Sequence, residues 1–465
     1  MSSRSAEHLR SAVTTDETTS SAPVKRRAGT MRRIISVGVV AVTMAACTSA
    51  STSSSTSTVS TFPGGSPWLG HFVTAALPSP VNALTDVTCA TSTRCWAVGS
   101  TVGGSGAPNG AALITTANGG VTWTGQAIPP QVGYLSAIAC SDQHHCIAVG
   151  QAAQNSNGQA ASIATSNGGA TWTLLAPPAG VLDITTVTCR PDRRCLAIGT
   201  TAGGSTALAT TSSASGWVER GPLPAGISGA TSISCTDDRT CWVTGHTLVD
   251  ADHVNGVVAL TGNGGTTWAV EATPKGLGYL SGVSCLPGST TGSGALPHRS
   301  GTGTAPATST ATAPSTTAAA PQSTAAITTI APTTTTAPAP IVGVAGARCT
   351  VVGTSATVLN GARTGHGILL TSDNGGATWA DRTVPATSAA LSGISCTALA
   401  TCVAVGSTVA SAPAAGIILV TGSTDSPWRH APSVSAPLSL SAVSCVSVSS
   451  CVAVGESISE HLSGT

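Results

Sequence analysis

The clearest copy of a repeated stretch in this chain reads Leu135-Ser-Ala-Ile-Ala-Cys140-Ser-Asp-Gln-His-His-Cys146-Ile-Ala-Val-Gly150. Two short runs of apolar and small residues flank a polar turn, with a cysteine at each end of the turn, which predicts an antiparallel hairpin. A third run, Ala161-Ser-Ile-Ala-Thr165, enters the turn Ser166-Asn-Gly-Gly-Ala-Thr-Trp172, and a fourth strand is expected after it. The stretch therefore predicts a small sheet of four antiparallel strands.

Seven pairs of cysteines mark seven copies of this stretch along the chain. The pairs are Cys89/Cys95, Cys140/Cys146, Cys189/Cys195, Cys235/Cys241, Cys285/Cys349, Cys396/Cys402 and Cys445/Cys451. Six have the spacing C-x5-C, and the fifth has it once 58 residues are removed from its loop. A period near 50 residues with short apolar runs is typical of a ring of small sheets. The sequence thus predicts an all-β, seven-bladed β-propeller of four-stranded antiparallel blades.

The ring is expected to close by joining the two ends of the chain. The last copy, Cys451-Val-Ala-Val-Gly455, lies almost at the C-terminus, so its outer strands must come from the N-terminal side. Val59-Ser-Thr-Phe-Pro-Gly-Gly-Ser-Pro-Trp68 aligns with Ile114–Trp123, which makes Trp68 the expected tryptophan of the seventh blade. Closure by N- and C-terminal strands removes open sheet edges, and the propeller is expected over residues 59–465.

The fifth cysteine pair is separated by a low-complexity insertion over residues 286–348. This segment is rich in Thr, Ala, Pro and Ser and almost free of charge. Such a composition cannot bury a core, so we expect a disordered segment. It is either a site of O-glycosylation or a tolerated spacer at a hairpin tip.

Residues 31–47 have the features of a bacterial lipoprotein signal peptide. Met31-Arg-Arg is a basic start, an apolar run of 13 residues follows, and the run ends in Met44-Ala-Ala-Cys47. This ending resembles a lipobox, with Met44 where Leu is usual, and the resemblance implies that Cys47 carries the lipid. A secreted protein and a single-pass N-terminal anchor are the alternatives. Residues 1–30 are a polar extension that is either a long cytoplasmic segment or, if Met31 is the start, not translated, and residues 48–58 form a Ser/Thr linker.

Export explains the cysteine count. The chain has 15 cysteines, and removal of Cys47 leaves an even number that pair outside the cytosol. Cysteines opposite one another across an antiparallel hairpin lie about 4.5–5.5 Å apart at Cα, within disulfide range. We therefore expect each of the seven pairs to form a disulfide. Zinc binding is disfavoured because the pairs are not C-x2-C knuckles.

Composition excludes some partners. Charged residues make up 8% of the chain and the net charge is +1, so no basic stripe is present and nucleic acid is not an expected partner. Aromatic residues make up only 3%, which limits stacking platforms for sugars. No phosphate loop, dinucleotide motif or Ser-His-Asp arrangement is evident, so no cofactor is expected.

The turn between the third and fourth expected strands resembles the Asp-box of BNR-repeat proteins, Ser-x-Asp-x-Gly-x-Thr-Trp. The best copy is Ser372-Asp-Asn-Gly-Gly-Ala-Thr-Trp379, in which Asn374 stands where the family usually has Asp. Other good copies are 116–123, 165–172 and 261–268, and eroded copies surround Trp217 and Trp428. An Asn side chain in such a turn accepts hydrogen bonds from the turn's own backbone. The resemblance implies a propeller in which each tryptophan packs between blades, and it carries almost no information on activity.

Proteins with this repeat include sialidases, which implies one alternative function, a sialidase-like glycoside hydrolase. Sialidases use an arginine triad, a tyrosine nucleophile with a glutamate partner, and an aspartate acid/base. The only tyrosines here, Tyr134 and Tyr279, occupy one repeat-equivalent position, which favours a packing role. Several arginines fall in the cysteine hairpins, at the face opposite the usual ligand face of a propeller. We therefore expect no catalytic residues and no enzyme activity.

The preferred interpretation is a non-catalytic binding or scaffold propeller at the cell envelope, most similar to uncharacterised bacterial surface proteins with this repeat. The resemblance also covers non-catalytic assembly factors of the photosystem II type and sortilin-like receptors. The expected partner is an envelope protein or a glycan, and the protein is expected to be a monomer that contacts the membrane only through its lipid.

One loop on the expected ligand face carries candidate binding residues, in the stretch His246-Thr-Leu-Val-Asp250-Ala-Asp252-His253. Asp250 and Asp252 are possible calcium ligands, and His246 and His253 possible ligands of a transition metal. A solvated polar loop without a metal is the preferred alternative.

Overall fold

The fold is described from a computed structural model of the full chain. It describes residues 35–38, 40–45, 71–101, 110–153, 158–210, 216–249, 254–288, 346–355, 358–359, 362–363, 365–397, 401–408, 415–421, 427–431, 438–447 and 449–460. No helix in these ranges is long and apolar enough to cross a membrane.

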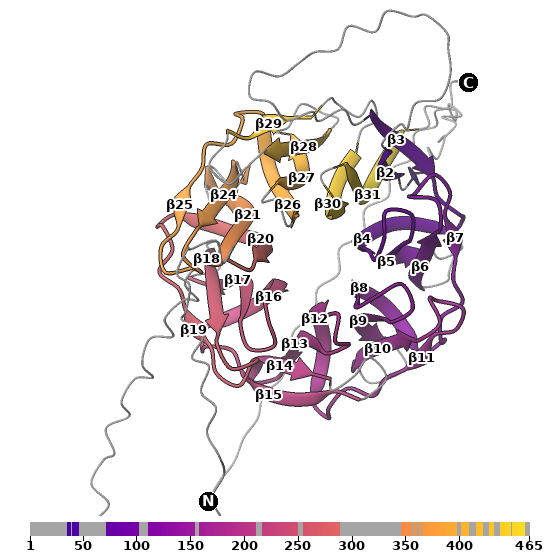
Figure 1. The fold of residues 1–465 in the computed structure, drawn as a ribbon, viewed down its shortest axis with the longest axis horizontal. Coiled ribbons are helices and arrows are strands. Elements are labelled where there is room, and N and C mark those ends of the chain that lie inside the picture. Colours follow the sequence, from indigo (N-terminus) through magenta and orange to yellow (C-terminus); the bar gives the residue numbers. More distant parts are fainter. Residues whose placement is uncertain are drawn as a thin grey trace, which may run out of the picture.

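Six four-stranded antiparallel sheets stand around a central axis (Figure 1). Each sheet takes its strands in chain order from the centre outward. The first contains β4 (Val81–Cys89), β5 (Cys95–Thr101), β6 (Gly110–Thr116) and β7 (Thr124–Gly125); the second β8 (Val132–Cys140), β9 (Cys146–Ala152), β10 (Ala160–Thr165) and β11 (Thr173–Leu174); the third β12 (Val181–Cys189), β13 (Cys195–Thr201), β14 (Gly204–Ala209) and β15 (Val218–Pro222); the fourth β16 (Ile227–Cys235), β17 (Cys241–Leu248), β18 (Val254–Thr261) and β19 (Ala269–Val270); the fifth β20 (Leu277–Leu286), β21 (Arg348–Ser355), β24 (Gly367–Ser372) and β25 (Ala380–Asp381); the sixth β26 (Ser388–Cys396), β27 (Cys402–Thr408), β28 (Gly416–Thr421) and β29 (Arg429–His430).

A further sheet, here called the closing sheet, joins the two ends of the described chain. It pairs β30 (Leu438–Ser447) with β31 (Ser450–Glu460), and β31 pairs with β1 (Ile35–Gly38) and β2 (Val40–Ala45). β2 in turn pairs with β3 (His71–Ala76). N-terminal strands therefore do pair with the last hairpin, but β2 stands where the sequence predicts Val59–Thr61. Residues 59–68, with Trp68, lie outside the described residues.

β1 and β2 fall within the segment 31–47 that the sequence predicts to be a signal peptide. Cys47 and the linker 48–58 lie outside the described residues, as does the extension 1–30. Cleavage before Cys47 would remove β1 and β2 from the mature chain and leave β3. The pairing of β31 with β1 and β2 therefore belongs to the uncleaved chain.

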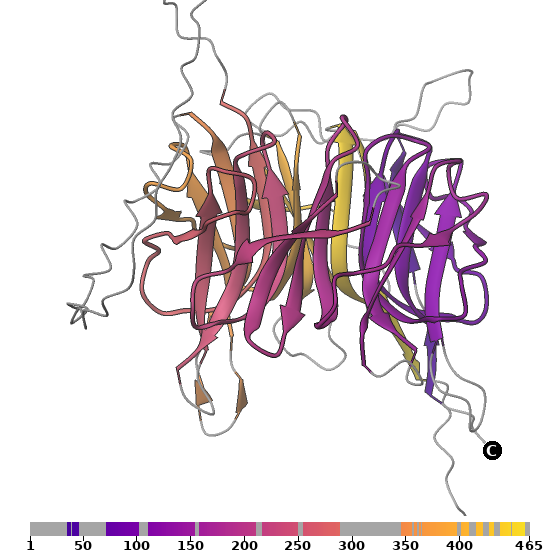
Figure 2. The ribbon, with the colours of Figure 1, turned by 90° about the horizontal axis from the view of Figure 1, so that it is seen from below.

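Two boundaries differ from prediction in the fifth sheet. The hairpin continues one residue pair beyond its cysteines, with Leu286 opposite Arg348, so the sheet includes both residues that were assigned to the ends of the insertion. Residues 289–345 lie outside the described part of the chain. A small extra hairpin, β22 (Val358–Leu359) with β23 (Ala362–Arg363), projects from one end of the ring (Figure 2).

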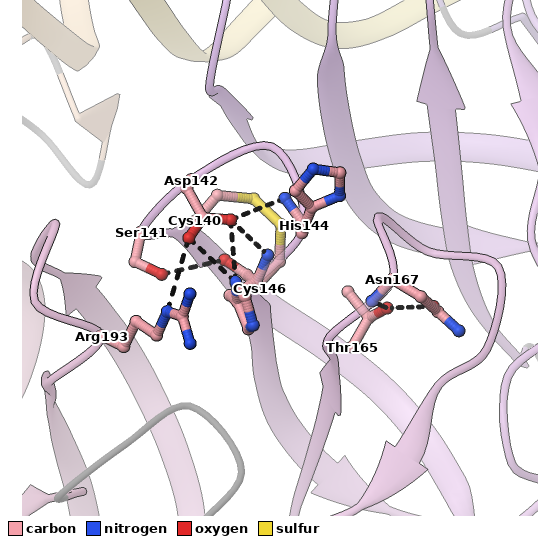
Figure 3. Close-up of polar contacts among 9 residues, drawn as sticks. Cys140, Ser141, Asp142, His144, Cys146, Thr165, Asn167 and Arg193 are labelled. Carbon is pink, nitrogen blue, oxygen red and sulfur yellow. Dashed lines mark hydrogen bonds and ion pairs between the residues drawn. A yellow bond between two sulfur atoms is a disulfide. The ribbon is translucent and has the colours of Figure 1, made fainter.

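The cysteine pairs lie directly opposite one another in the inner hairpins, as Cys140 and Cys146 do. Seven disulfides join the seven pairs that the sequence predicts. The backbone N–H of Gly168, in the Asn-Gly-Gly turn, donates to the carbonyl of His144 in the cysteine hairpin at 2.9 Å. Figure 3 shows the two turns side by side. Both turn types therefore lie at one end of the ring, the hairpin face; the opposite end is the mouth face.

The Asn-Gly-Gly turns are held by their own side chains, as the sequence predicts. In the turn 165–172, Asn167 Oδ1 accepts the N–H of Thr171 at 2.9 Å, and Thr165 Oγ1 accepts the N–H of Gly169 at 2.9 Å. Gly169 has a φ of 93°, a conformation that favours glycine. The turns at 116–123, 261–268 and 372–379 repeat these bonds.

The hydrophobic core lies between neighbouring sheets. Trp217 of the third sheet packs with Ile147 and Val149 of the second, and its indole N–H donates to Ser162 Oγ at 2.9 Å. This confirms that a turn tryptophan bridges two sheets. Because each sheet is only four short strands, it gains its buried area from its neighbours, and the sheets stabilise one another around the ring.

Each inner hairpin contains a β-bulge, and in four of them the bulge directs one hydroxyl toward the next sheet. In β8 the register shifts between Leu135 and Ala137, so Ser136 has no opposite residue. Ser136 Oγ then donates to the carbonyl of Ile184 in the next sheet at 2.7 Å. Equivalent residues behave alike: Thr85 bonds to Leu135, Thr231 to Leu280, and Ser281 to Leu391. Residue 150, opposite the bulge, is a glycine because the Cβ of any other residue would overlap the Tyr134 carbonyl oxygen.

A second set of hydroxyls, one residue before the first cysteine in four of the hairpins, continues through the closing sheet. Ser234 accepts the N–H of Cys285, Ser284 that of Cys396, and Ser395 that of Cys445. Ser444 of β30 accepts the N–H of Cys89 in β4 at 3.0 Å. β30 packs against β4, so the inner strands form an unbroken circle.

Asp86, three residues before Cys89, links the first two sheets at the position equivalent to Ser232. Its Oδ1 accepts the N–H of Val87 and its Oδ2 that of Ile138, both at 2.8 Å. Burial raises the pKa of Asp86 from 3.8 to about 7, against the lowering effect of these two hydrogen bonds. The folded protein therefore holds this proton more tightly than the unfolded chain, and the group's stabilisation is complete below pH 3.8 and is lost as pH rises through about 7.

We expect Asp86→Ser to flatten the pH dependence of stability. Ser fits because Ser232 at the equivalent position accepts the N–H of Val283. When the pH rises from 5 to 8, the free energy of unfolding of the wild type should fall by roughly 2–3 kcal/mol more than that of the variant. Urea unfolding at both pH values measures this. Asp381→Ser, at an exposed site, should keep the wild-type dependence; an unchanged slope in Asp86→Ser would contradict the assignment.

Candidate functional site

Four side chains from successive sheets gather where the inner strands begin, at the mouth face. Tyr134 of β8, Asp183 of β12 and Tyr279 of β20 stand six residues before the first cysteine of their hairpins. In β16 this position is Gly229, and the ring of His246 from β17 fills the space, since a Cβ on Gly229 would lie 2.6 Å from His246 Cε1. We call Tyr134, Asp183, His246 and Tyr279 the mouth cluster.

His246 and Tyr279 form one half of the mouth cluster. Their ring centroids lie 4.5 Å apart with an interplanar angle of 30°. Burial lowers the pKa of His246, so the imidazole is neutral at neutral pH. Its Nδ1 is buried and has no hydrogen-bond partner among the described residues. An unsatisfied polar atom of this kind costs about 1–3 kcal/mol, a cost that a bound ligand can remove by supplying a hydrogen bond.

Asp183 and Tyr134 form the other half. Burial raises the pKa of Asp183, and a hydrogen bond with Gln151 opposes this. Asp183 Oδ1 is also buried without a partner in the described part of the chain. Burial raises the pKa of Tyr134, a hydrogen bond with Thr85 opposes this, and the nearby charge of Asp183 adds to the increase. The phenol therefore stays protonated at neutral pH and carries a proton that it can donate to a ligand.

The sequence predicts a packing role for the two tyrosines, and the structure shows that both are also partly exposed. Tyr134 is 38% exposed and Tyr279 is 42% exposed. Leu248 and Val249, where the β17 hairpin reaches the same face, are exposed as well. The mouth face thus presents partly exposed aromatic and aliphatic side chains beside neutral polar groups.

Only one of the four predicted binding residues can be placed. His246 lies in β17 and belongs to the mouth cluster, whereas Asp250, Asp252 and His253 lie outside the described residues. Within the residues that are described, no three His, Cys, Asp or Glu side chains form a group able to hold a metal ion. The calcium and transition-metal alternatives for this loop remain predictions.

The arginines of the cysteine hairpins lie on the hairpin face, as expected. Figure 3 shows Arg193 of the third sheet reaching Asp142 in the hairpin of the second sheet, where Nε and Oδ2 are 3.7 Å apart. Asp142 also accepts the N–H groups of His144 and His145 at 2.7 and 2.9 Å. These contacts join two neighbouring hairpins.

Sequence reasoning missed Asp183 and assigned the tyrosines another role, although the repeat contains a usable signal. When the seven copies are aligned on their first cysteines, the position six residues before it holds Ala83, Tyr134, Asp183, Gly229, Tyr279, Ala390 and Ser439. Three copies have a large or charged residue at this position, and the other four have a small one. No repeat signal reveals His246, because its place depends on the absence of a side chain at Gly229.

No family model matches this chain, and no curated protein matches it. Among solved structures it is similar to Ycf48 bound to a D1 peptide, at 11% identity and a TM-score of 0.48, over 82% of this chain and 92% of that chain. It is similar to Ycf48 from Cyanidioschyzon merolae at 12% identity and a TM-score of 0.45, over 82% and 97% of the two chains. A catalytically inactive virginiamycin B lyase from Staphylococcus aureus with quinupristin has 9% identity and a TM-score of 0.46, with 82% and 97% covered. At these identities the similarity concerns the backbone arrangement alone.

Proposed function

We propose that this protein is a non-catalytic binding propeller of seven blades, the closing sheet being the seventh, which recognises an envelope protein or a glycan through the mouth cluster. The observation that carries the proposal is that the inner hairpins of four successive sheets place two partly exposed tyrosines, a neutral imidazole and a half-buried carboxyl at the mouth face. Neutral donors and acceptors beside aromatic rings suit sugar hydroxyls and peptide groups. The disulfides and inter-sheet hydrogen bonds hold these side chains on rigid strands.

The chemistry of Tyr134 supports binding over glycoside hydrolysis. A tyrosine nucleophile has to lose its proton, which a lowered pKa favours, whereas burial raises the pKa of Tyr134. A screen with 4-methylumbelliferyl glycosides should therefore show no turnover. Turnover that is abolished by Tyr134→Phe or Tyr279→Phe would support the hydrolase alternative instead.

The mouth cluster is tested by affinity capture with a matched pair of variants. Three exported proteins are immobilised and exposed to envelope extract and to a glycan array. They are the wild type, the double variant Tyr134→Ala/Tyr279→Ala and the control Val121→Ala. Val121 is exposed in a turn of the hairpin face. The affinity of the double variant for its partner should fall at least tenfold, because exposed aromatic anchors each contribute about 1–2 kcal/mol or more to binding. Val121→Ala should bind the partner as the wild type does. Identical capture by all three proteins would contradict the proposal.

Seven disulfides fit an oxidising, extracytoplasmic location. We propose in addition that a lipid on Cys47 anchors the protein to the membrane. Metabolic labelling with a fatty acid should tag the wild type and give no signal with Cys47→Ala. Met44→Leu, which restores the usual lipobox residue, should label at least as strongly as the wild type. Equal labelling of the wild type and Cys47→Ala would exclude the anchor.

A further inference from the structure

A cavity of about 330 Å³ opens on the hairpin face between the third and fourth sheets. Its walls come from the cysteine hairpin 189–195, the cysteine hairpin 235–241, β15 and the turn at Asn263 and Gly264. The mouth cluster lies at the other end of the same strands. The cavity is therefore a second, separate candidate site.

Positive charge is concentrated in this cavity. Arg190, Arg194, Arg220 and Arg239 line it together with Asp237 and Asp238. Asp192 lies beside the lining, 3.7 Å from Arg190 Nε and 3.9 Å from Arg194 Nε, so four positive charges stand against three negative ones. The entire chain has a net charge of +1 and only 8% charged residues. A local excess of this size in a concave site attracts anions.

The guanidinium groups have unused hydrogen-bonding capacity. Arg194 Nη1 lies 3.8 Å from Asp238 Oδ2, and Arg190 Nε lies 3.7 Å from Asp192 Oδ1, both beyond hydrogen-bond distance. Arg190 Nε is buried without a hydrogen-bond partner. Within the described part of the chain, none of the four guanidinium groups makes a hydrogen bond. Each therefore keeps donors free for a ligand.

The two aspartates of the cavity offset only part of this positive charge. Asp237 Oδ1 accepts the backbone N–H groups of Arg239 and Thr240 at 2.8 Å each. Burial opposes ionisation of this carboxylate, but its hydrogen bonds and the charge of Arg190 lower its pKa. Asp238 is exposed and pairs only loosely with Arg194. Both carboxylates nevertheless repel a ligand with several negative charges, which favours a singly charged group over phosphate.

The remaining lining is apolar. Leu196, Ala209 and the half-cystines Cys195, Cys235 and Cys241 contribute to it, and most of these are buried. A ligand that fits has a planar anionic head for the forked guanidinium donors and a short aliphatic stem. A peptide carboxylate has both features, whether it belongs to an acidic side chain or to a chain terminus.

We propose that this cavity, the arginine pocket, binds the carboxylate of an acidic peptide between Arg190, Arg194, Arg220 and Arg239. The site lies beyond the proposed function, since it is on the opposite face from the mouth cluster. It gives the propeller two binding faces, so that one molecule can hold a peptide on the hairpin face while the mouth face is occupied.

The test uses fluorescein-labelled peptides and fluorescence anisotropy with the complete exported protein. One amidated peptide carries two central glutamates, a second carries glutamines in their place, and a third has apolar residues and a free C-terminal carboxylate. The glutamate or the free-terminus peptide should bind at least about tenfold more tightly than the glutamine peptide, because hydrogen bonds to charged groups contribute about 1.5–3 kcal/mol. Which of the two binds better identifies the source of the carboxylate.

Two variants assign binding to the pocket. Arg194→Gln/Arg220→Gln changes two exposed side chains and should weaken carboxylate binding at least about tenfold, with an unchanged unfolding midpoint. Arg193→Gln, in the same turn but paired with Asp142, should bind as the wild type does. Equal binding of the glutamine peptide, absence of binding by all three peptides, or an equal loss in Arg193→Gln would each overturn the proposal.

Discussion

Replacing Cys285 and Cys349 by serine should lower the free energy of unfolding by about 4 kcal/mol, roughly twice the loss from the same change at Cys140 and Cys146. The first disulfide joins residues separated by 64 positions, and the second joins residues separated by 6. A disulfide restricts the unfolded chain more when it closes a longer loop. The low-complexity insertion therefore makes the fifth disulfide the most stabilising of the seven.

The comparison is internally matched, because both pairs lie opposite one another in an inner hairpin and both second cysteines are fully buried. The local cost of replacing sulfur by oxygen then cancels between the two double variants. Urea unfolding of the purified proteins gives both free energies. Equal losses would contradict the loop-length account, as would a smaller loss for the fifth pair.

Trp242→Ala should destabilise the protein by about 3–5 kcal/mol, the range for truncating a large buried aromatic side chain. Trp242 is fully buried in the cluster between the fourth and fifth sheets, with Leu260, Leu280 and Trp379. Its indole N–H donates to the carbonyl of Gly375 at 3.1 Å. The substitution thus removes both packing and an inter-sheet hydrogen bond.

Phenylalanine variants separate these two contributions. Trp96 is equally buried at the equivalent position of the first sheet, but its indole N–H has no partner among the described residues. Trp242→Phe should therefore cost about 1 kcal/mol more than Trp96→Phe. The unfolding free energies of the two variants measure the difference. Equal costs would mean that the bond to Gly375 contributes nothing to stability.

The repeat could be predicted from sequence because its signals are local. A polar five-residue turn between two apolar runs places Cys140 opposite Cys146, and the Asn167 turn is held by bonds within eight residues. Six sheets follow from these patterns. The hydroxyl bonds from Ser136 and Ser444 could not be predicted, because they depend on bulges and on which sheet lies next in the ring.

The ends of the chain were harder to assign because two segments suit the same place. Val40–Ala45 and Val59–Thr61 are both short and contain β-branched residues, and strand pairing alone distinguishes them weakly. The mouth cluster was hard to predict for a different reason. Its residues come from four separate copies of the repeat, so only the ring geometry brings Asp183, His246 and Tyr279 to one face.

The central claim, recognition at the mouth face, is tested most directly by photo-crosslinking. Benzoylphenylalanine is placed at Leu248, which is exposed beside the mouth cluster without belonging to it, or at Val121, which is exposed on the hairpin face. After irradiation of intact cells, the account predicts a discrete crosslinked product from position 248 and none from position 121, and loss of the product when Tyr134 and Tyr279 are replaced by Ala. Crosslinks from position 121 alone would contradict it.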